Sequence, residues 1–227
     1  MPNITLYRKD GSCSLAPHTL IRHLSIPFTE VRMAVDADGR YQPADGSLTS
    51  AQYRQTIHPA GYVPALVIHD ASVTITELPA VLTYIASLAP ERDLLGGSDA
   101  VRRAQVAEWL AWLSGTVHSL GFAAVWRPYR FADEGGAHDA IRAKGRAVVG
   151  GSFARIEERL GGREWAVGEA PTVVDFNLYV FRRWGEQVGG FEMARQFPSY
   201  DAVMRRLEGL DGVKKALEAE GLKPLFS

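Results

Sequence analysis

The fold of this chain is indicated first by residues 3–24, which read NITLYRKDGSCSLAPHTLIRHL. Residues 3–7 have the β-prone composition of a short strand, and residues 14–24 carry apolar side chains at helical spacing. The small residues Gly11-Ser12-Cys13-Ser14 therefore lie where a strand turns into a helix. This turn begins a mixed strand and helix pattern that continues to residue 88.

The remaining elements up to residue 88 alternate in type. The expected elements are a strand at 28–35, a loop at 36–50, a helix at 51–57, a hairpin of strands at 63–69 and 73–76, and a helix at 77–88. The order β-α-β-α-β-β-α indicates a small α/β domain. Residues 89–98, APERDLLGGS, have the composition of a linker.

From residue 99 onward the sequence shows helical patterns only. The expected helices span 99–126, 137–160, 172–188, 199–207 and 212–220. The uncharged stretch 109–126 reaches the length of about 18 residues that raises the question of a membrane span. It contains Ser114, Thr116 and His118, so a helix buried among other helices is expected instead. We therefore expect an α/β domain at 1–88, a linker at 89–98 and an all-helical domain at 99–227.

The composition is that of an ordinary globular chain, with 46% hydrophobic and 22% charged residues among 227. Its 25 basic and 26 acidic residues leave a formal charge of −1, which argues against nucleic acid or an anionic membrane as partner. The single cysteine excludes an intrachain disulfide, and no residue cluster has the spacing of metal ligands. Because no such cluster is present, we expect no bound metal. The N-terminal residues lack a signal-peptide core, so we expect a cytoplasmic protein.

Cys13 is the first candidate for chemistry. The first N–H groups of a helix carry a positive partial charge, which favours a thiolate over a thiol. Ser12 and Ser14 flank the cysteine and could donate hydroxyl hydrogen bonds to a bound thiolate. Lone cysteines are also often buried and inert, so position alone leaves both interpretations open.

The second candidate is Tyr62-Val63-Pro64, where a proline opens a strand. If the bond before Pro64 were cis, the Val63 N–H and C=O could face outward and pair with a peptide-like ligand. Only about 5–6% of such bonds are cis, so composition alone favours an ordinary turn.

The third candidate is Glu77-Leu78, which we expect in the first turn of a helix capped by Thr76. The unpaired N–H groups there can hold a ligand carboxylate, and Glu77 could accept an ammonium group. Alternatively, Glu77 only offsets the helix dipole.

The fourth candidate is the stripe His118, Phe122 and Trp126, whose spacing places the three side chains on one helix face. Such a stripe either lines an apolar pocket or forms core.

Five segments together resemble the cytosolic glutathione S-transferases, and most closely the bacterial beta class. They are Gly11-Ser12-Cys13-Ser14-Leu15-Ala16-Pro17-His18, Gly61-Tyr62-Val63-Pro64-Ala65-Leu66, Gly121-Phe122 with Trp126-Arg127-Pro128, residues 165–168 with the capping box of Thr172 and Asp175, and Ala219-Glu220-Gly221-Leu222. The resemblance covers nearly the whole chain.

The resemblance implies a thioredoxin-like domain that binds glutathione and a helical domain that lines the pocket for a small hydrophobic electrophile. Glutathione, as co-substrate, would lie along Tyr62, Val63 and Pro64. Its γ-glutamyl end would meet Glu77 and the Leu78 N–H, and its sulfur would lie near Cys13. The family also implies a homodimer and a role in detoxification.

Three positions depart from the family pattern. Leu78 replaces the usual Ser or Gly, His118 lies one place before the usual histidine position (here Ser119), and Arg8 replaces a frequent tyrosine. Two alternatives therefore accompany the transferase function. One is a glutathione-dependent thiol–disulfide reductase that uses Cys13, and the other is a non-catalytic ligand-binding protein on the same fold.

Overall fold

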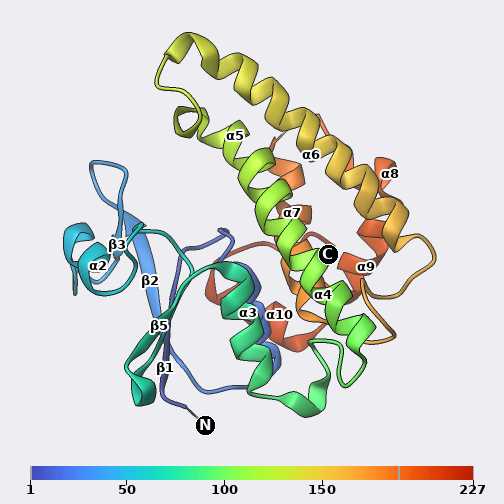
Figure 1. The fold of residues 1–227 in the computed structure, drawn as a ribbon, viewed down its shortest axis with the longest axis horizontal. Coiled ribbons are helices and arrows are strands. Elements are labelled where there is room, and N and C mark those ends of the chain that lie inside the picture. Colours follow the sequence, from blue (N-terminus) through green and yellow to red (C-terminus); the bar gives the residue numbers. More distant parts are fainter. Residues whose placement is uncertain (1, 189, 227) are drawn as a thin grey trace. The chain divides into compact units, whose positions relative to one another are not determined.

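The computed structural model describes residues 2–188 and 190–226, and Figure 1 shows their arrangement. Contacts divide the chain into two compact units. One unit combines residues 1–95 with 207–227, and the other contains residues 96–206. Among the described residues, no helix combines the length and the apolar character that a membrane crossing needs.

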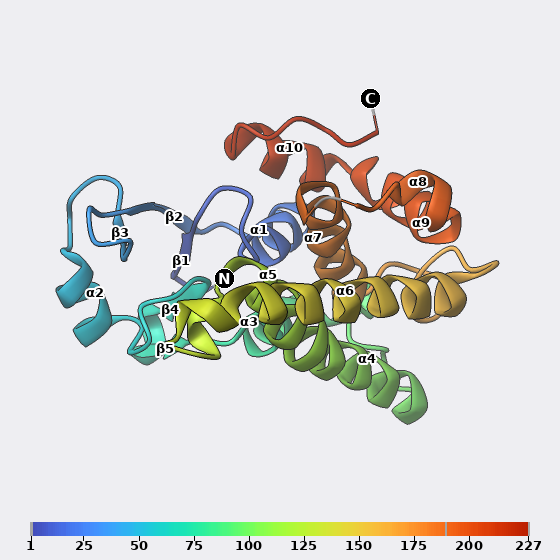
Figure 2. The ribbon, with the colours of Figure 1, turned by 90° about the horizontal axis from the view of Figure 1, so that it is seen from above.

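The N-terminal unit is built on a five-stranded mixed sheet with the order β3-β2-β1-β4-β5. Its strands are β1 (Ile4–Arg8), β2 (Thr29–Val35), β3 (Tyr41–Pro43), β4 (Ala65–Ile68) and β5 (Val73–Ile75). Strands β1 and β2 are parallel, while the other neighbouring pairs are antiparallel. Helix α1 (Leu15–His23) connects the parallel pair and packs against α3 (Leu78–Ser87). Helix α2 (Ser50–Thr56) lies beside β3 at the sheet edge (Figure 2).

Strand β3 lies inside the segment 36–50, which we expected to be loop throughout. Its three residues pair with β2, and Tyr41 packs against the buried cluster of Met33, Tyr53 and Val63. The strand could not be predicted because turn-forming residues surround it. Its extended backbone depends on contacts with β2 and with that cluster. Two further 3₁₀ turns follow β4 and α3, at His69–Ala71 and Pro90–Arg92.

The helical unit begins with one continuous helix at the expected position, but its middle is π-helical. The three parts are α4 (Ala100–Trp112), the π-helical stretch Leu113–Phe122 and α5 (Ala123–Trp126). The N–H of Ala123 bonds to the His118 carbonyl five residues back. This wider turn changes the directions of side chains relative to an α-helix, which sequence spacing does not reveal.

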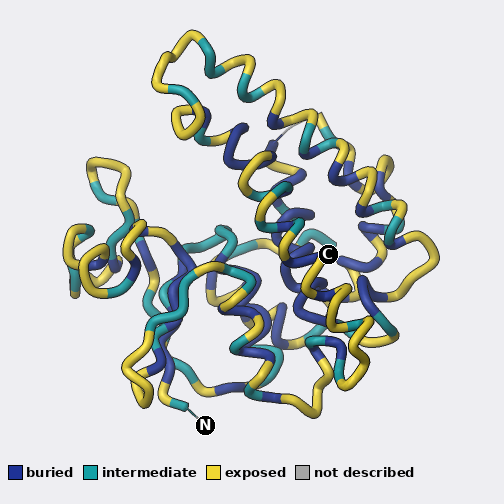
Figure 3. Tube along the Cα trace, viewed as in Figure 1, coloured by how far each residue is buried: buried dark blue, intermediate teal, exposed yellow. Residues whose placement is uncertain are grey.

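The remaining helices are α6 (His138–Leu160), α7 (Val173–Val188), α8 (Met193–Gln196), α9 (Pro198–Glu208) and α10 (Asp211–Ala219), with 3₁₀ turns at Pro128–Arg130 and Gly135–Ala137. Four agree with the expected helices, and α8 was not expected. Helix α6 runs alongside the π-helical stretch and α5 (Figure 1). Most residues of β1, α1 and α7 are buried (Figure 3).

Helix α10 packs against α1 rather than within the helical unit, which differs from the domain limits expected above. Gly212 allows this close approach, since a Cβ atom there would lie 2.2 Å from the Cα of His23. The missing side chain lets the two backbones touch, and the sequence alone does not identify which helix Gly212 meets.

Candidate functional site

Cys13 lies between the end of β1 and the first residue of α1, as the sequence predicts. The residue is half-buried, and its thiol donates a hydrogen bond of 3.2 Å to the carbonyl oxygen of Val63. The two residues are 50 positions apart in the chain. The structure therefore brings together the first two candidate motifs.

The two serines beside Cys13 differ in their surroundings. Ser14 is completely buried, and its hydroxyl accepts a hydrogen bond from the Lys9 N–H at 2.9 Å. Ser12 and Ser14 join their hydroxyl oxygens at 2.8 Å. Ser14 therefore closes the turn before α1, while the half-buried Ser12 is the better placed of the two to turn toward a ligand.

The peptide bond between Val63 and Pro64 is cis, contrary to the ordinary turn that composition favours. Val63 is only 7% exposed, while Tyr62 before it is exposed. Within residues 2–188 and 190–226, the Val63 N–H has no hydrogen-bond partner. Buried backbone donors without a partner are rare, so this N–H is a candidate contact for a ligand.

Glu77 occupies the N-cap position of α3, which corrects the expectation that Thr76 would cap this helix. Its backbone has φ 65° and ψ 117°. A positive φ is uncommon for a residue other than glycine, and such conformations cluster at functional sites. Glu77 is exposed and Leu78 is half-buried as the first residue of α3.

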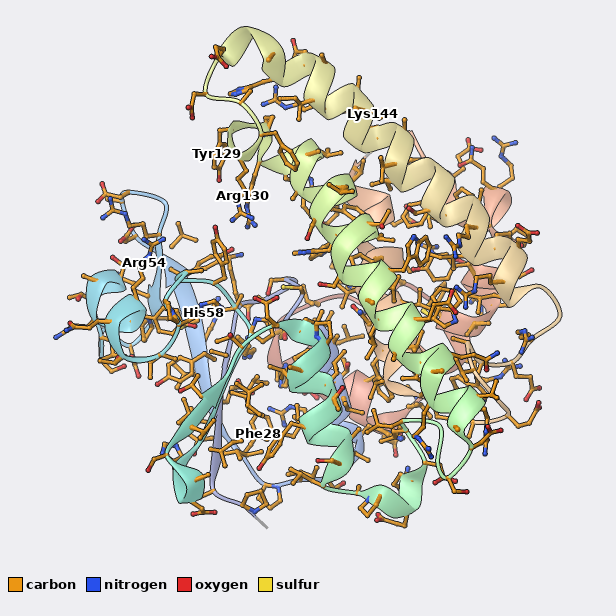
Figure 4. All side chains as sticks on the ribbon, viewed as in Figure 1. Phe28, Arg54, His58, Tyr129, Arg130 and Lys144 are labelled. Carbon is orange, nitrogen blue, oxygen red and sulfur yellow. The ribbon has the colours of Figure 1, made fainter. Side chains whose placement is uncertain are left out.

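His58 is a neighbour of this region that the sequence analysis did not single out. Its side chain is buried, and among the described residues its Nδ1 atom has no hydrogen-bond partner. Burial lowers the pKa of His58 below its ordinary value, although the charge of Glu77 acts in the opposite direction. Figure 4 labels His58 and Arg54, whose guanidinium donates to the Ala60 carbonyl at 3.1 Å and so braces the turn that leads to Tyr62.

Arg8, which stands where the family that this chain resembles often has a tyrosine, is buried in an ion network. It pairs with Asp10 and with Glu30, the latter at 2.5 Å. Burial alone would raise the pKa of Glu30, but the hydrogen bond from Arg8 and the charge of His18 bring it below its ordinary value. The edge of Phe28 (Figure 4) covers His18 at a ring distance of 6.0 Å. Arg8 therefore holds the end of β1 and is directed away from solvent.

The stripe on the helical unit divides into core and surface. Phe122 is completely buried, with its ring stacked 5.7 Å from that of Phe181. His118 stacks on Trp184 at 5.5 Å, and Trp126 meets the same Trp184 ring at 4.9 Å while remaining 41% exposed. The Phe122 ring lies 5.1 Å from that of Trp126 and 5.2 Å from that of Trp184, so it supports the Trp126 ring from the core. Trp184 could not be associated with this stripe from local sequence, because it lies on α7.

His118 is a neutral group in these surroundings. Burial lowers its pKa to about 4, and the charges of Arg127 and Arg130 act in the same direction. Tyr129 and Arg130 lie next to each other on the turn that follows α5 (Figure 4). The neighbouring Ser119, at the position where the resembling family has its histidine, donates its hydroxyl to the Ser114 carbonyl at 2.8 Å.

Comparison with known proteins agrees with this geometry. The family model "Glutathione S-transferase, C-terminal domain" matches residues 117–211. The chain is 31% identical to glutathione S-transferase GST-4.5 of Xanthomonas campestris, over 96% of this chain and 98% of that protein. It is 29% identical to glutathione S-transferase GstA of Escherichia coli O157:H7, over 96% of this chain and 99% of that protein.

Two solved structures share the fold over nearly the full length. A sphingomonad glutathione S-transferase complexed with glutathione has a TM-score of 0.80 and 31% identity, covering 96% of this chain and 100% of its own. The bacterial beta class glutathione S-transferase of Sphingomonas chungbukensis has a TM-score of 0.80 and 28% identity over the same shares. The thioredoxin-like and helical architecture expected from the motifs is confirmed, and the chain belongs to the glutathione S-transferase family.

Proposed function

We propose that this protein is a glutathione transferase that activates the thiol of glutathione for attack on a small hydrophobic electrophile. The observation that carries the proposal is the meeting of the Cys13 thiol with the Val63 carbonyl beside the cis peptide bond. Cys13, expected near the sulfur of glutathione, is thus in contact with Val63, whose backbone can pair with a peptide.

Glutathione would bind through groups that suit each part of a peptide. The Val63 N–H donates to the carbonyl of its cysteinyl unit, in the manner of an added strand. Glu77 accepts the γ-glutamyl ammonium, and the first N–H groups of α3 meet the γ-glutamyl carboxylate. The related sphingomonad enzyme was solved in complex with glutathione, which supports glutathione as the ligand.

Activation requires the bound thiol to lose its proton near neutral pH. A shift of 2 pKa units corresponds to about 2.7 kcal/mol of additional stabilisation of the thiolate. The N-terminus of α1 and the Ser12 hydroxyl supply positive partial charge for that purpose. The thiolate then forms a carbon–sulfur bond with the electrophile, whose leaving group departs with its electron pair, while the thiol proton passes to solvent.

The electrophile would contact the helical unit at Trp126 and His118, with Phe122 behind them. Because the pKa of His118 is about 4, its ring is neutral at pH 7 and contributes an aromatic surface rather than a charge. An aromatic or alkyl co-substrate suits this surface. The same proposal includes a cytoplasmic location, a homodimeric assembly and a role in detoxification.

A glutathione-dependent thiol–disulfide reductase is the second candidate, and the position of Cys13 favours it. The Cys13 thiolate would attack the glutathione sulfur of a mixed disulfide, form a disulfide with glutathione, and release the other sulfur as a thiol. A second glutathione would then reduce the disulfide formed on Cys13, so that oxidised glutathione leaves. The third possibility, a binding protein without turnover, is consistent with Leu78 in place of a serine or glycine.

Calorimetry and two activity assays separate these functions. We expect wild type to bind glutathione at micromolar to millimolar concentration, and Glu77→Ala to weaken binding sharply. Conjugation that persists in Cys13→Ser supports the transferase, whereas disulfide exchange that disappears in Cys13→Ser supports the reductase. Saturable binding of apolar ligands with no turnover in either assay would indicate a binding protein. No binding of glutathione at millimolar concentration would exclude both enzymatic functions.

A further inference from the structure

Tyr53 of α2 anchors the backbone directly before the cis peptide bond. Its side chain is completely buried, and its hydroxyl donates a hydrogen bond of 2.7 Å to the carbonyl oxygen of Tyr62. Burial raises the pKa of Tyr53 above its ordinary value, so the phenol remains protonated and remains a donor. The bond therefore joins α2 to the segment that carries Val63.

The direction of this bond determines the direction of the next backbone donor. Among the described peptide bonds only that between Val63 and Pro64 is cis, so the bond between Tyr62 and Val63 is trans. In a planar trans peptide, the C=O of one residue and the N–H of the next point in opposite directions. Because the Tyr62 carbonyl points toward the Tyr53 hydroxyl, the Val63 N–H points away from it.

A second contact limits rotation of the same residue. The Val63 side chain packs in one buried cluster with Tyr53 and Met33, and the ring of Tyr7 lies 5.4 Å from that of Tyr53. Tyr7 also pairs with Ala65, which follows Pro64 in β4. The peptide plane before Val63 is thus held by the hydroxyl of Tyr53, and the side chain and the following strand are held by the cluster and by β1.

We propose that Tyr53 is a positioning residue for glutathione, because its hydroxyl aims the Val63 N–H at the cysteinyl carbonyl of the ligand. This inference rests on the glutathione site proposed above and adds a residue that does not touch the ligand. The absence of any partner for the Val63 N–H among the described residues fits a donor reserved for a ligand. Without the hydroxyl, this peptide plane would rotate more freely and the donor would spend less time in the binding direction.

The chain offers a matched control in its helical unit. Tyr200 is also completely buried, and its hydroxyl donates to the Leu178 carbonyl at 2.5 Å. Tyr53→Phe and Tyr200→Phe therefore each remove one oxygen atom and one buried hydroxyl-to-carbonyl bond. A merely structural role of Tyr53 predicts the same result for both variants, namely a lower melting temperature with unchanged glutathione affinity.

The experiment measures the glutathione Kd by calorimetry, the KM and kcat for glutathione, and the melting temperature of wild type and both variants. We expect Tyr53→Phe to raise Kd and KM about three- to tenfold with little change in kcat, the loss typical of one hydrogen bond. Tyr200→Phe should leave Kd and KM at the wild-type values. Equal Kd values for wild type and Tyr53→Phe, or an equal rise in both variants, would overturn the inference.

A second measurement keeps the inference testable if Tyr53→Phe is poorly stable. In valine-labelled protein, the amide signal of Val63, assigned with Val63→Ile, should shift on addition of glutathione to wild type and shift less in folded Tyr53→Phe at equal saturation. Identical shifts in the two proteins would also overturn the inference. Failure of the glutathione site itself has a different signature, because wild type would then bind no glutathione and show no shift.

Discussion

Glu220 and Gly11 are joined by a hydrogen bond of 2.7 Å between a carboxylate oxygen and a backbone N–H, although 209 residues separate them. The second carboxylate oxygen of Glu220 lies 2.8 Å from Nδ1 of the completely buried His18. Gly11 leads directly into Ser12 and Cys13. The segment after α10 therefore holds the loop that presents the thiol.

Glu220→Ala should destabilise the protein by about 3 kcal/mol. The substitution removes the buried carboxylate that accepts from the Gly11 N–H and contacts Nδ1 of His18, and broken buried pairs cost about this much. Urea unfolding measures the change. Glu218→Ala, at an exposed position of α10, is the control and should change the free energy of unfolding by less than about 0.5 kcal/mol. Equal stability of the two variants would contradict the role given to Glu220.

Gly212→Ala should be strongly destabilising, by about 2 kcal/mol or more. The new Cβ atom would lie 2.2 Å from the Cα of His23, and backbone cannot move aside as a flexible side chain can. Gly151→Ala in α6 is the matched control, because nothing lies within 4 Å of its added Cβ atom. That control should stabilise the helix by about 0.5–1 kcal/mol. Thermal unfolding should show a lower melting temperature for Gly212→Ala and a higher one for Gly151→Ala than for wild type.

Acid should weaken the fold partly through His118. Its pKa in the folded state is about 4, below the ordinary value of 6.5. The unfolded chain therefore takes up a proton as the pH falls below about 6.5, while the folded state does not until about 4. This stabilisation is complete above that range and is lost toward pH 4, by about 3 kcal/mol. His118→Phe should remove the dependence, and parallel stability curves for wild type and the variant from pH 7 to 4 would refute it.

Trp126→Ala should lower kcat/KM for the electrophile without changing the KM for glutathione. The exposed ring of Trp126 rests on Trp184, and loss of one aromatic contact typically corresponds to about a tenfold fall in kcat/KM. Steady-state kinetics with an aromatic electrophile at saturating glutathione tests this. Tyr129→Ala removes an exposed ring three residues later and should change kcat/KM less. A rise in the glutathione KM of Trp126→Ala would instead indicate that Trp126 contacts glutathione.

Leu78→Ser should strengthen glutathione binding about fivefold. The backbone N–H at this position remains, and the serine adds a hydroxyl that can donate to the ligand carboxylate, a gain of about 1 kcal/mol. Calorimetry at one pH compares the variant with wild type. Leu120→Ser, at an exposed position of the helical unit, serves as the control for a general change in polarity. Weaker binding by Leu78→Ser would indicate an apolar contact between Leu78 and the ligand.

Local patterns were sufficient for most secondary structure. The strand before Cys13, the helix after it and the hairpin around Asp70 all have signals within a few residues, so their positions could be predicted. Strand β3 and helix α8 are too short to carry a period, and the π-helical stretch has the same composition as an α-helix. The N-cap at Glu77 was missed because its positive φ reflects the surrounding structure rather than the residue type.

The sequence by itself determined the family, the two kinds of domain and the candidate residues Cys13, Val63 and Glu77, because these follow from short motifs and their order. Only the tertiary structure decided that the Cys13 thiol donates to the Val63 carbonyl, that the Tyr53 hydroxyl donates to the Tyr62 carbonyl, and that the Glu220 carboxylate accepts from the Gly11 N–H. Each of these is a contact between residues distant in the chain or a backbone direction. Such contacts depend on how helices and strands pack, and local sequence does not record which surfaces meet.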